Sequence, residues 1–322
     1  MKDGRRPIPP TIYNVSMERR NFLRSALGPA VTRLAQARKT LPRRRYRDDV
    51  QLSIIGFGGM VLVGQEQKGA GRMVADAIER GVNYFDVAPT YGDGEAEIKL
   101  GNALAPYRQN VFLACKTTAR DAAGAQKELD RSLERLHTDH FDLYQFHAVS
   151  SLGDVEQILG PGGAAETFLK ARAQGKVRYL GCSAHSAEAA LALMDKFQLD
   201  SILFPVNFVL YEQGGFGPQI MARAKEKGVA RLALKSLAYT KWPEGAQRTY
   251  PKCWYQPVDQ GELARQALRF TLSEDVTAAI PPGDERLFQI ALELASEFKP
   301  LSPAERRTLL AGTAGIAPIF RA

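Results

Sequence analysis

Two residues in the stretch 81–92 have the types and spacing of a proton-transfer site. Asp86 lies near the end of a short apolar run, residues 82–87, and Tyr91 follows five residues later, directly before a glycine. If the run forms a buried strand, Asp86 lies where the strand ends and Tyr91 lies in the loop that follows. Tyr91 is then able to fold back toward the carboxylate. A carboxylate and a phenol placed in this way can hold and move a proton.

Two further apolar runs end in polar residues with matching chemistry. Residues 111–115 are followed by Lys116, and residues 143–146 are followed by His147. A phenol with an ordinary pKa of about 10 is a poor acid at neutral pH, so it needs a nearby cation. Lys116 supplies that charge, Asp86 holds the ammonium group, and His147 can donate a hydrogen bond to a carbonyl oxygen. This combination suits reduction of a carbonyl, with the hydride coming from an external cofactor.

The elements that must position these residues alternate between strand and helix from residue 50 onward. The predicted strands are 52–57, 82–87, 111–115, 141–146, 177–182, 201–206, 229–234 and 276–280. The predicted helices are 72–80, 96–104, 125–136, 167–174, 188–197, 218–227, 261–271 and 285–298. The strands are almost continuously apolar, which is typical of parallel strands covered on both faces. Eight such repeats predict a single-domain α/β fold, the (β/α)8 TIM barrel, whose catalytic groups lie at the carboxyl ends of the strands.

A doubly wound open sheet is the competing fold. It would need a nucleotide-binding turn after its first strand, and residues 56–59 (GFGG) have some of the glycines. The third glycine of the GxGxxG pattern is missing, and polar residues 65–68 follow where the helix should start. The barrel is therefore preferred.

The composition excludes several classes of protein. The chain of 322 residues has no apolar run of about 18 residues, so no spanning helix is expected. Its three cysteines form no CxxC pair, which excludes a metal or iron–sulfur cluster of that type. His137 and His140 have no third ligand nearby and are interpreted as helix-end residues, so no metal site is predicted. We expect a small-molecule carbonyl substrate as the partner; the oligomeric state stays open.

The positive charge of the chain belongs to its first part. Residues 1–50 contain 13 Lys and Arg against 4 Asp and Glu, whereas the other 272 residues contain 30 against 31. A nucleic-acid groove across the folded domain is therefore not expected. Residues 1–48 are interpreted as a basic leader and residues 49–322 as the barrel.

The leader contains a pattern close to a twin-arginine export signal. Residues 19–24 read RRNFLR, and residues 35–37 (AQA) could serve as a cleavage site. The apolar core between them is interrupted by Gly28, Pro29 and Arg33. A disordered leader retained in the cytoplasm is the expected interpretation, and export to the periplasm is the alternative.

The motifs together resemble the aldo-keto reductase family. The resemblance is carried by the stretches GVNYFDVAPTYGDGEAEIKLGNAL, VFLACKT, ELDRSLERLHTDHFDLYQFH and GKVRYLGCS, and it extends over about residues 50–322. It implies that Asp86, Tyr91, Lys116 and His147 form a catalytic tetrad in which Tyr91 donates the proton. It also implies a nicotinamide cofactor, usually NADPH, which lies across the mouth of the barrel without a Rossmann motif.

The resemblance also implies positions that contact the cofactor. Ser183 matches the residue that meets the carboxamide, although its usual Asn neighbour is Ala184 here. The implied cofactor-binding residues are Gly59, Met60, Asp86, Ser183, Asn207, Lys235, Ser236, Leu237, Gly283 and Arg286. The family's Lys-Ser pair for the 2′-phosphate is missing after the last strand, where Asp284 and Glu285 would repel a phosphate. NADP(H) is favoured by the resemblance, and NAD(H) stays possible.

The long loop after the seventh strand contains Trp242, Tyr250, Trp254 and Tyr255. These aromatic residues either form a wall of the substrate pocket or pack the loop onto the barrel. His185, two residues after Ser183, is a candidate contact to cofactor or substrate. The predicted function is NAD(P)H-dependent reduction of an aldehyde or ketone. The alternatives are a nucleotide-binding regulatory subunit with little turnover, and a sugar dehydrogenase or epimerase that retains its cofactor.

Overall fold

Eight parallel strands form the centre of the fold in the computed structural model, which describes Met1 and residues 40–322. The strands are β3 (Phe57–Gly58), β4 (Tyr84–Asp86), β5 (Phe112–Thr117), β6 (Phe141–Val149), β7 (Val177–Ala184), β8 (Ser201–Pro205), β9 (Ala230–Leu234) and β12 (Ala278–Ile280). Each strand pairs in parallel with the next one in this series. Ile55 bridges to Ala279, which joins the two edges of the sheet. The predicted (β/α)8 barrel is confirmed.

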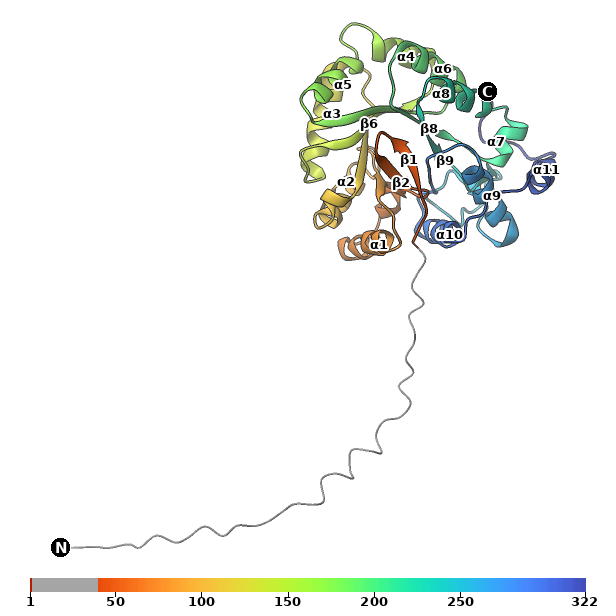
Figure 1. Ribbon diagram of the computed structural model, residues 1–322, viewed down its shortest axis with the longest axis horizontal. Helices are drawn as coiled ribbons and strands as arrows, with labels where there is room; N and C mark the ends of the chain where they lie inside the picture. The colour runs from red at the N-terminus through yellow and green to blue at the C-terminus, as the bar shows by residue number, and fades with distance from the viewer. Residues whose placement is uncertain (2–39) are drawn as a thin grey trace. The chain divides into compact units, whose positions relative to one another are not determined.

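The helices surround the strands in a ring (Figure 1). They are α1 (Gln67–Glu79), α2 (Glu95–Leu104), α3 (Ala122–Arg135), α4 (Leu152–Leu159), α5 (Ala164–Ala173), α6 (Ala187–Lys196), α7 (Phe208–Gln213), α8 (Pro218–Glu226), α9 (Gly261–Ser273), α10 (Glu285–Ser296) and α11 (Pro303–Ala311). The eight predicted helices are all present, with ends that differ by a few residues. Helices α4, α7 and α11 were not predicted from the sequence. No helix in the described part of the chain is long and apolar enough to cross a membrane.

Two separate clusters of buried side chains stabilise the barrel. The larger cluster lies between the strands and the helices, and includes Phe85, Phe146, Phe168 and Phe288. The smaller cluster lies inside the barrel. It consists of every second residue of the strands, whose side chains point inward, together with residues 46 and 52. Side chains of both clusters are almost fully removed from solvent, so burial of apolar surface on both faces of the sheet holds the strand ends in place.

A hairpin of two antiparallel strands precedes the barrel. It consists of β1 (Arg43–Arg47) and β2 (Val50–Ser53), and Figure 1 shows it over the middle of the ring of helices. Tyr46 packs edge-on against Phe112, at 5.1 Å between ring centroids, and against Tyr179, at 5.3 Å. The hairpin therefore closes the amino-terminal end of the barrel, opposite the strand ends that carry Asp86 and Lys116.

The arginines of the hairpin have structural partners. Arg44 donates to the backbone oxygens of Leu272 and Val276, at 2.6 and 2.7 Å, and Arg47 pairs with Asp200 at 3.1 Å. Residues 40–48, which were predicted to belong to the leader, are thus part of the same compact unit as the barrel. The twin-arginine pattern at residues 19–24 and the candidate cleavage site lie outside the described residues.

The predicted first strand, 52–57, is wrong as a single element. β2 ends at Ser53, and β3 begins only at Phe57. Between them the backbone changes partners: the Ile54 nitrogen donates to Pro42, next to the hairpin, whereas the Gly56 nitrogen donates to Ala279 of the barrel at 2.9 Å. An apolar run in the sequence does not reveal this change, because both halves are equally buried.

Removing the ring of Tyr46 tests whether the hairpin stabilises the barrel. Tyr46→Ala leaves a cavity among buried aromatic rings, so we expect the free energy of unfolding to fall by about 3–5 kcal/mol. Urea unfolding followed by circular dichroism measures the change. Arg43→Ala, at an exposed position of the same strand, is the control. Equal stability of the two variants would show that the hairpin contributes nothing to the fold.

Candidate functional site

The alternation of side chains along the strands brings the predicted residues to one end of the barrel. Tyr84 and Asp86 are two residues apart on β4, so both point inward, as do Gln145 and His147 on β6. The register places Lys116 of β5 opposite Gln145 of β6. These side chains therefore meet inside the carboxyl end of the barrel.

A buried ion pair lies at the centre of this cluster. Lys116 and Asp86 have 1% and 2% of their side chains exposed, and the Lys116 Nζ donates a short hydrogen bond to Asp86 Oδ1. The other oxygen of Asp86 accepts from the Gln145 amide at 2.9 Å and from the Tyr84 hydroxyl at 3.2 Å. Lys116 also donates to the Val87 backbone oxygen at 3.1 Å. The Asp86 carboxylate thus accepts hydrogen bonds from three donors. Because Gln145 and Tyr84 hold the carboxylate in place, the carboxylate in turn fixes the position of the Lys116 ammonium group.

Tyr91 lies against this ion pair. Its hydroxyl accepts a long hydrogen bond, 3.5 Å, from the Lys116 Nζ, which also lies 5.1 Å from the centroid of the Tyr91 ring. A turn positions the residue, since the Tyr91 nitrogen donates to the Ala88 oxygen. The His147 ring stands edge-on to the Tyr91 ring at 5.8 Å between centroids. Asp86, Tyr91, Lys116 and His147 thus form one contiguous group.

Burial and charge set the protonation states of the group. Burial lowers the pKa of Lys116, but the attraction of Asp86 and Tyr91 outweighs it, so the pKa lies above its ordinary value. Burial raises the pKa of Tyr91, and the Lys116 charge offsets part of this rise. Burial and the charges of Lys116 and its basic neighbours hold the pKa of His147 well below its ordinary range. At neutral pH the lysine is therefore charged, the phenol keeps its proton, and the imidazole is neutral.

The group opens into a cavity of about 210 Å³. Five of the predicted candidates line its wall: Met60, Ser183, His185, Lys235 and Gly283. The cavity is also lined by residues that the sequence analysis did not predict, including Lys252, Cys253 and Pro282. Tyr84 and Gln145 were missed as well, although each lies two residues before a predicted site residue. That spacing on a strand is the signal that could have found them.

The other predicted cofactor residues lie outside the lining of this cavity. Gly59 packs against Val87, and Leu237 is fully buried in the core. Asn207 accepts from the Leu210 nitrogen as the cap of α7, and its amide donates to the Lys235 oxygen at 3.2 Å. Ser236 is buried, and its hydroxyl has no hydrogen-bond partner among the described residues.

Arg286 lies at the start of α10 with half of its side chain exposed. It pairs with Asp284, at 3.2 Å, and donates to the Thr249 oxygen at 2.8 Å. Its guanidinium group lies 4.3 Å from the centroid of the Tyr250 ring. The arginine therefore joins the end of β12 to the loop that precedes β11.

Part of the long loop after β9 lines the cavity, and part of it packs within the fold. It contains the hairpin of β10 (Ala238–Lys241) and β11 (Tyr255–Pro257). Trp254 and Tyr255 line the cavity. Trp242 instead packs the loop, because its ring nitrogen donates to the Cys253 oxygen at 2.9 Å.

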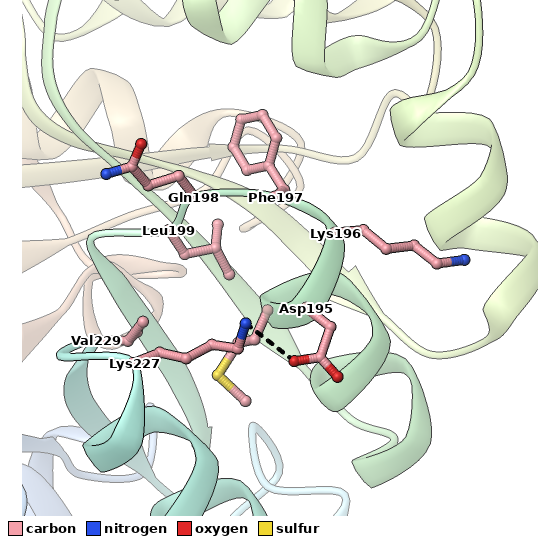
Figure 2. A pocket seen from close by; sticks show the side chains of 8 residues that line it. Asp195, Lys196, Phe197, Gln198, Leu199, Lys227 and Val229 are labelled. Carbon is pink, nitrogen blue, oxygen red and sulfur yellow. Dashed lines mark ion pairs between the residues drawn. The ribbon is translucent and has the colours of Figure 1, made fainter.

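A second hollow, of about 320 Å³, lies at the other end of the barrel, where α6 and α8 end (Figure 2). Asp195 and Lys227 form an ion pair there, with 3.1 Å between the carboxylate and the ammonium group. Most of its other lining residues are apolar or uncharged, including Phe197, Leu199 and Val229. It has none of the residues of the predicted site. Among the described residues, no group of three or more His, Cys, Asp or Glu side chains is placed to hold a metal ion.

Comparison with known proteins gives one consistent result. Residues 54–304 match the family described as "Aldo/keto reductase family". The uncharacterized oxidoreductase YqkF of Bacillus subtilis is 28% identical over 302 residues, which cover 84% of this chain and 96% of that protein. The aldo-keto reductase AKR11C1 from Bacillus halodurans, in its holo form, superimposes with a TM-score of 0.66 at 25% identity, over 88% of this chain and all of the other.

A third match is a solved structure that contains a cofactor. It is an aldo-keto reductase from Klebsiella pneumoniae in complex with NADPH, with a TM-score of 0.65 at 19% identity. The match covers 88% of this chain and 98% of that one. At this identity the likeness supports the barrel fold.

Breaking the ion pair tests how strongly it holds the site. Lys116→Met leaves Asp86 buried without its cation, so we expect the free energy of unfolding to fall by about 3–5 kcal/mol. The double variant Lys116→Met/Asp86→Leu removes both charges and should be more stable than the single variant. Urea unfolding measures both. A double variant less stable than Lys116→Met would contradict this account of the pair.

Proposed function

The chain belongs to the aldo/keto reductase family and is an NAD(P)-dependent oxidoreductase, and we propose that it reduces a small aldehyde or ketone with Tyr91 as the proton donor. The observation that supports this role is the position of the Tyr91 hydroxyl, 3.5 Å from the ammonium group of Lys116. The reaction adds a hydride to the carbonyl carbon and a proton to the carbonyl oxygen, which gives an alcohol.

The proton transfer follows from the charges around Tyr91. As the carbonyl oxygen takes the proton, negative charge develops on the phenol oxygen. The Lys116 charge stabilises this phenolate, because it is fixed in place and buried away from water. The carboxylate of Asp86 holds the lysine ammonium group, and hydrogen bonds from Gln145 and Tyr84 hold the carboxylate. These side chains therefore need not move during the proton transfer. Lys116 thus raises the acidity of Tyr91 in the transition state of the proton transfer.

His147 has a different role in this proposal. Its imidazole is neutral at neutral pH, because burial and neighbouring positive charges hold its pKa far below the ordinary range. A neutral imidazole can donate one hydrogen bond and is a weak acid. We assign it the task of orienting the carbonyl oxygen toward the Tyr91 hydroxyl, next to which its ring stands.

Residues in and around the cavity are proposed to bind a nicotinamide dinucleotide. Ser236 follows the lining residue Lys235, and its buried hydroxyl has no hydrogen-bond partner among the described residues, so it is proposed to bind an oxyanion. Gly283 lies on the cavity wall packed against Met60, where an added Cβ would come within 2.4 Å of the Met60 side chain, so a residue larger than glycine would displace Met60 from the wall. Ser183, Met60, Gly283, Ser236 and Arg286 are the residues proposed to hold the cofactor. When bound, the reduced nicotinamide supplies the hydride.

NADP(H) is the proposed cofactor, with NAD(H) as the alternative. The carboxylates of Asp284 and Glu285, which were expected to repel a 2′-phosphate, both form ion pairs in the structure. Asp284 binds Arg286, and Glu285 pairs with Lys252 at 3.5 Å and accepts from Gln65 at 2.6 Å. Their repulsion of a phosphate is therefore reduced, and the half-exposed guanidinium of Arg286 is available to a phosphate from the open side.

Removing the Tyr91 hydroxyl tests the proposed proton donor. Tyr91→Phe keeps the ring against Lys116 and His147 but leaves nothing to protonate the carbonyl oxygen. We expect kcat for 4-nitrobenzaldehyde with NADPH to fall at least 10³-fold, while the dissociation constant of NADPH changes less than threefold. Tyr107→Phe, at a tyrosine outside the cavity, is the control. Turnover within tenfold of wild type in Tyr91→Phe would exclude the assignment.

A change at Arg286 tests the proposed cofactor. Arg286→Met removes the guanidinium group, so the dissociation constant of NADPH should rise about tenfold, equivalent to ~1.4 kcal/mol. NADH lacks the 2′-phosphate, so its dissociation constant should rise less than threefold. Quenching of tryptophan fluorescence measures both constants. Arg248→Met, an exposed arginine in the nearby loop, is the matched control. Equal losses for the two cofactors would show that Arg286 does not bind the 2′-phosphate.

A further inference from the structure

The charges that line the cavity cancel one another except for one. Asp86, which is the only carboxylate among the lining residues, is paired with Lys116. Lys252 is paired with Glu285 and donates to the Val61 oxygen at 3.0 Å. The remaining lysine is Lys235, and no carboxylate in the described part of the chain forms an ion pair with it. The cavity therefore has one unpaired positive charge at neutral pH.

The structure fixes the direction of the Lys235 side chain. Its backbone has a φ of 61°, at the start of the loop after β9, and its oxygen accepts from the Asn207 amide. The ammonium group lies 5.4 Å from the centroid of the Trp254 ring and 5.3 Å from that of Tyr255. Two aromatic walls thus hold the cation in the cavity without neutralising it, which leaves its hydrogen-bond donors for a ligand.

Lys235 belongs to the end of the cavity that contains the histidines. Burial and the Lys235 charge lower the pKa of His185 to about 4, and Lys235 is among the charges that lower the pKa of His147. The pKa of Arg286 is instead raised, chiefly by its hydrogen bond with Asp284, and Lys235 is not among the groups that shift it. The lysine therefore lies within electrostatic range of His147, where the carbonyl group is proposed to react.

We propose that Lys235 binds an anionic group of the substrate, so that the favoured substrates are short aldehydes or ketones that also contain a carboxylate. This inference rests on the proposed function for the reaction itself. An anion beside Lys235 would pair with the one unpaired charge of the cavity through charge-assisted hydrogen bonds. Such hydrogen bonds are stronger than the cation–π contacts that the lysine already makes. The diphosphate of the cofactor is the other source of an oxyanion, and the experiment separates the two.

The first experiment compares a substrate that has a carboxylate with its uncharged ester. The probes are 4-oxobutanoate and its uncharged methyl ester, both reduced with NADPH. For the wild type, kcat/KM for the acid should exceed that for the ester at least tenfold. Lys235→Met should reduce this ratio at least tenfold, and Lys235→Arg should keep it within threefold. Lys227→Met removes a lysine charge at the opposite end of β9 (Figure 2) and should keep the wild-type ratio. An unchanged ratio in Lys235→Met would overturn the proposal.

The second experiment identifies the source of the oxyanion. Dissociation constants of NADPH and NADH are measured for the wild type and for Lys235→Met. We expect them to agree within threefold. If both constants rise more than tenfold in Lys235→Met, and turnover of acid and ester falls equally, the lysine binds the cofactor diphosphate and the proposal is wrong.

The third experiment needs no turnover. Butanoate is titrated into the wild-type protein, and its binding is followed by tryptophan fluorescence, because the ring of Trp254 lies beside Lys235. Saturable binding that is at least tenfold weaker in Lys235→Met, with butanamide as the uncharged control, supports the proposal. The absence of butanoate binding to the wild type overturns it. Butanoate binding without any reduction of either probe would refute the proposed function and leave this site standing.

The pH dependence gives an independent check. Burial lowers the pKa of Lys235 to about 8, so the side chain is charged below that pH and neutral above it. Butanoate affinity should therefore be constant from pH 6 to 7 and fall at least tenfold by pH 10. Lys235→Arg keeps its charge over this range and should keep its affinity. A wild-type affinity independent of pH would contradict the role of Lys235.

Discussion

The buried pair of Asp86 and Lys116 is the interaction on which the rest of the site depends. Two charges with almost no exposure to water persist only when further hydrogen bonds complete the pair. Here Tyr84, Gln145 and the Val87 backbone provide them. Because these groups come from adjacent strands, the barrel must close in one register for the pair to form. The same pair then sets the charge beside Tyr91, which links the packing of the barrel directly to its proton chemistry.

The sequence revealed most of the barrel, because strands covered on both faces are apolar runs and the helices between them are amphipathic. It did not reveal β1. That strand reads RRRYR, and only Tyr46 among its residues is buried. Its arginines are held by contacts with Leu272, Val276 and Asp200, more than 150 residues away, so the local pattern is that of a charged leader. The boundary between β2 and β3 was also hidden, since it is a change of hydrogen-bond partner within one apolar run.

Asp86, Lys116 and His147, near the carboxyl ends of β4, β5 and β6, could be grouped from sequence with Tyr91 of the following loop, because parallel strands place consecutive strand ends side by side. The residues that line the rest of the cavity could not be grouped from sequence. Lys235, Trp254 and Tyr255 meet through the path of a long loop, and Asn207 turned its amide toward the backbone instead of the cavity. Pairing of Asp284 and Glu285 with basic neighbours likewise depends on side-chain placement. Loop conformation, which periodicity does not encode, decides all of these contacts.

The central claim is that Tyr91 gives its proton to the carbonyl oxygen while His147 stays neutral. The most direct measurement is the single-turnover rate of reduction of an uncharged aldehyde by saturating NADPH, followed by stopped-flow absorbance from pH 5 to 11. The donor must be protonated, and the pKa of Tyr91 lies above its ordinary value of about 10. The account therefore predicts a constant rate up to about pH 10 and a decline only beyond it. A rate that falls through pH 6–7 would identify an acid with the ordinary pKa of a histidine and would contradict the account.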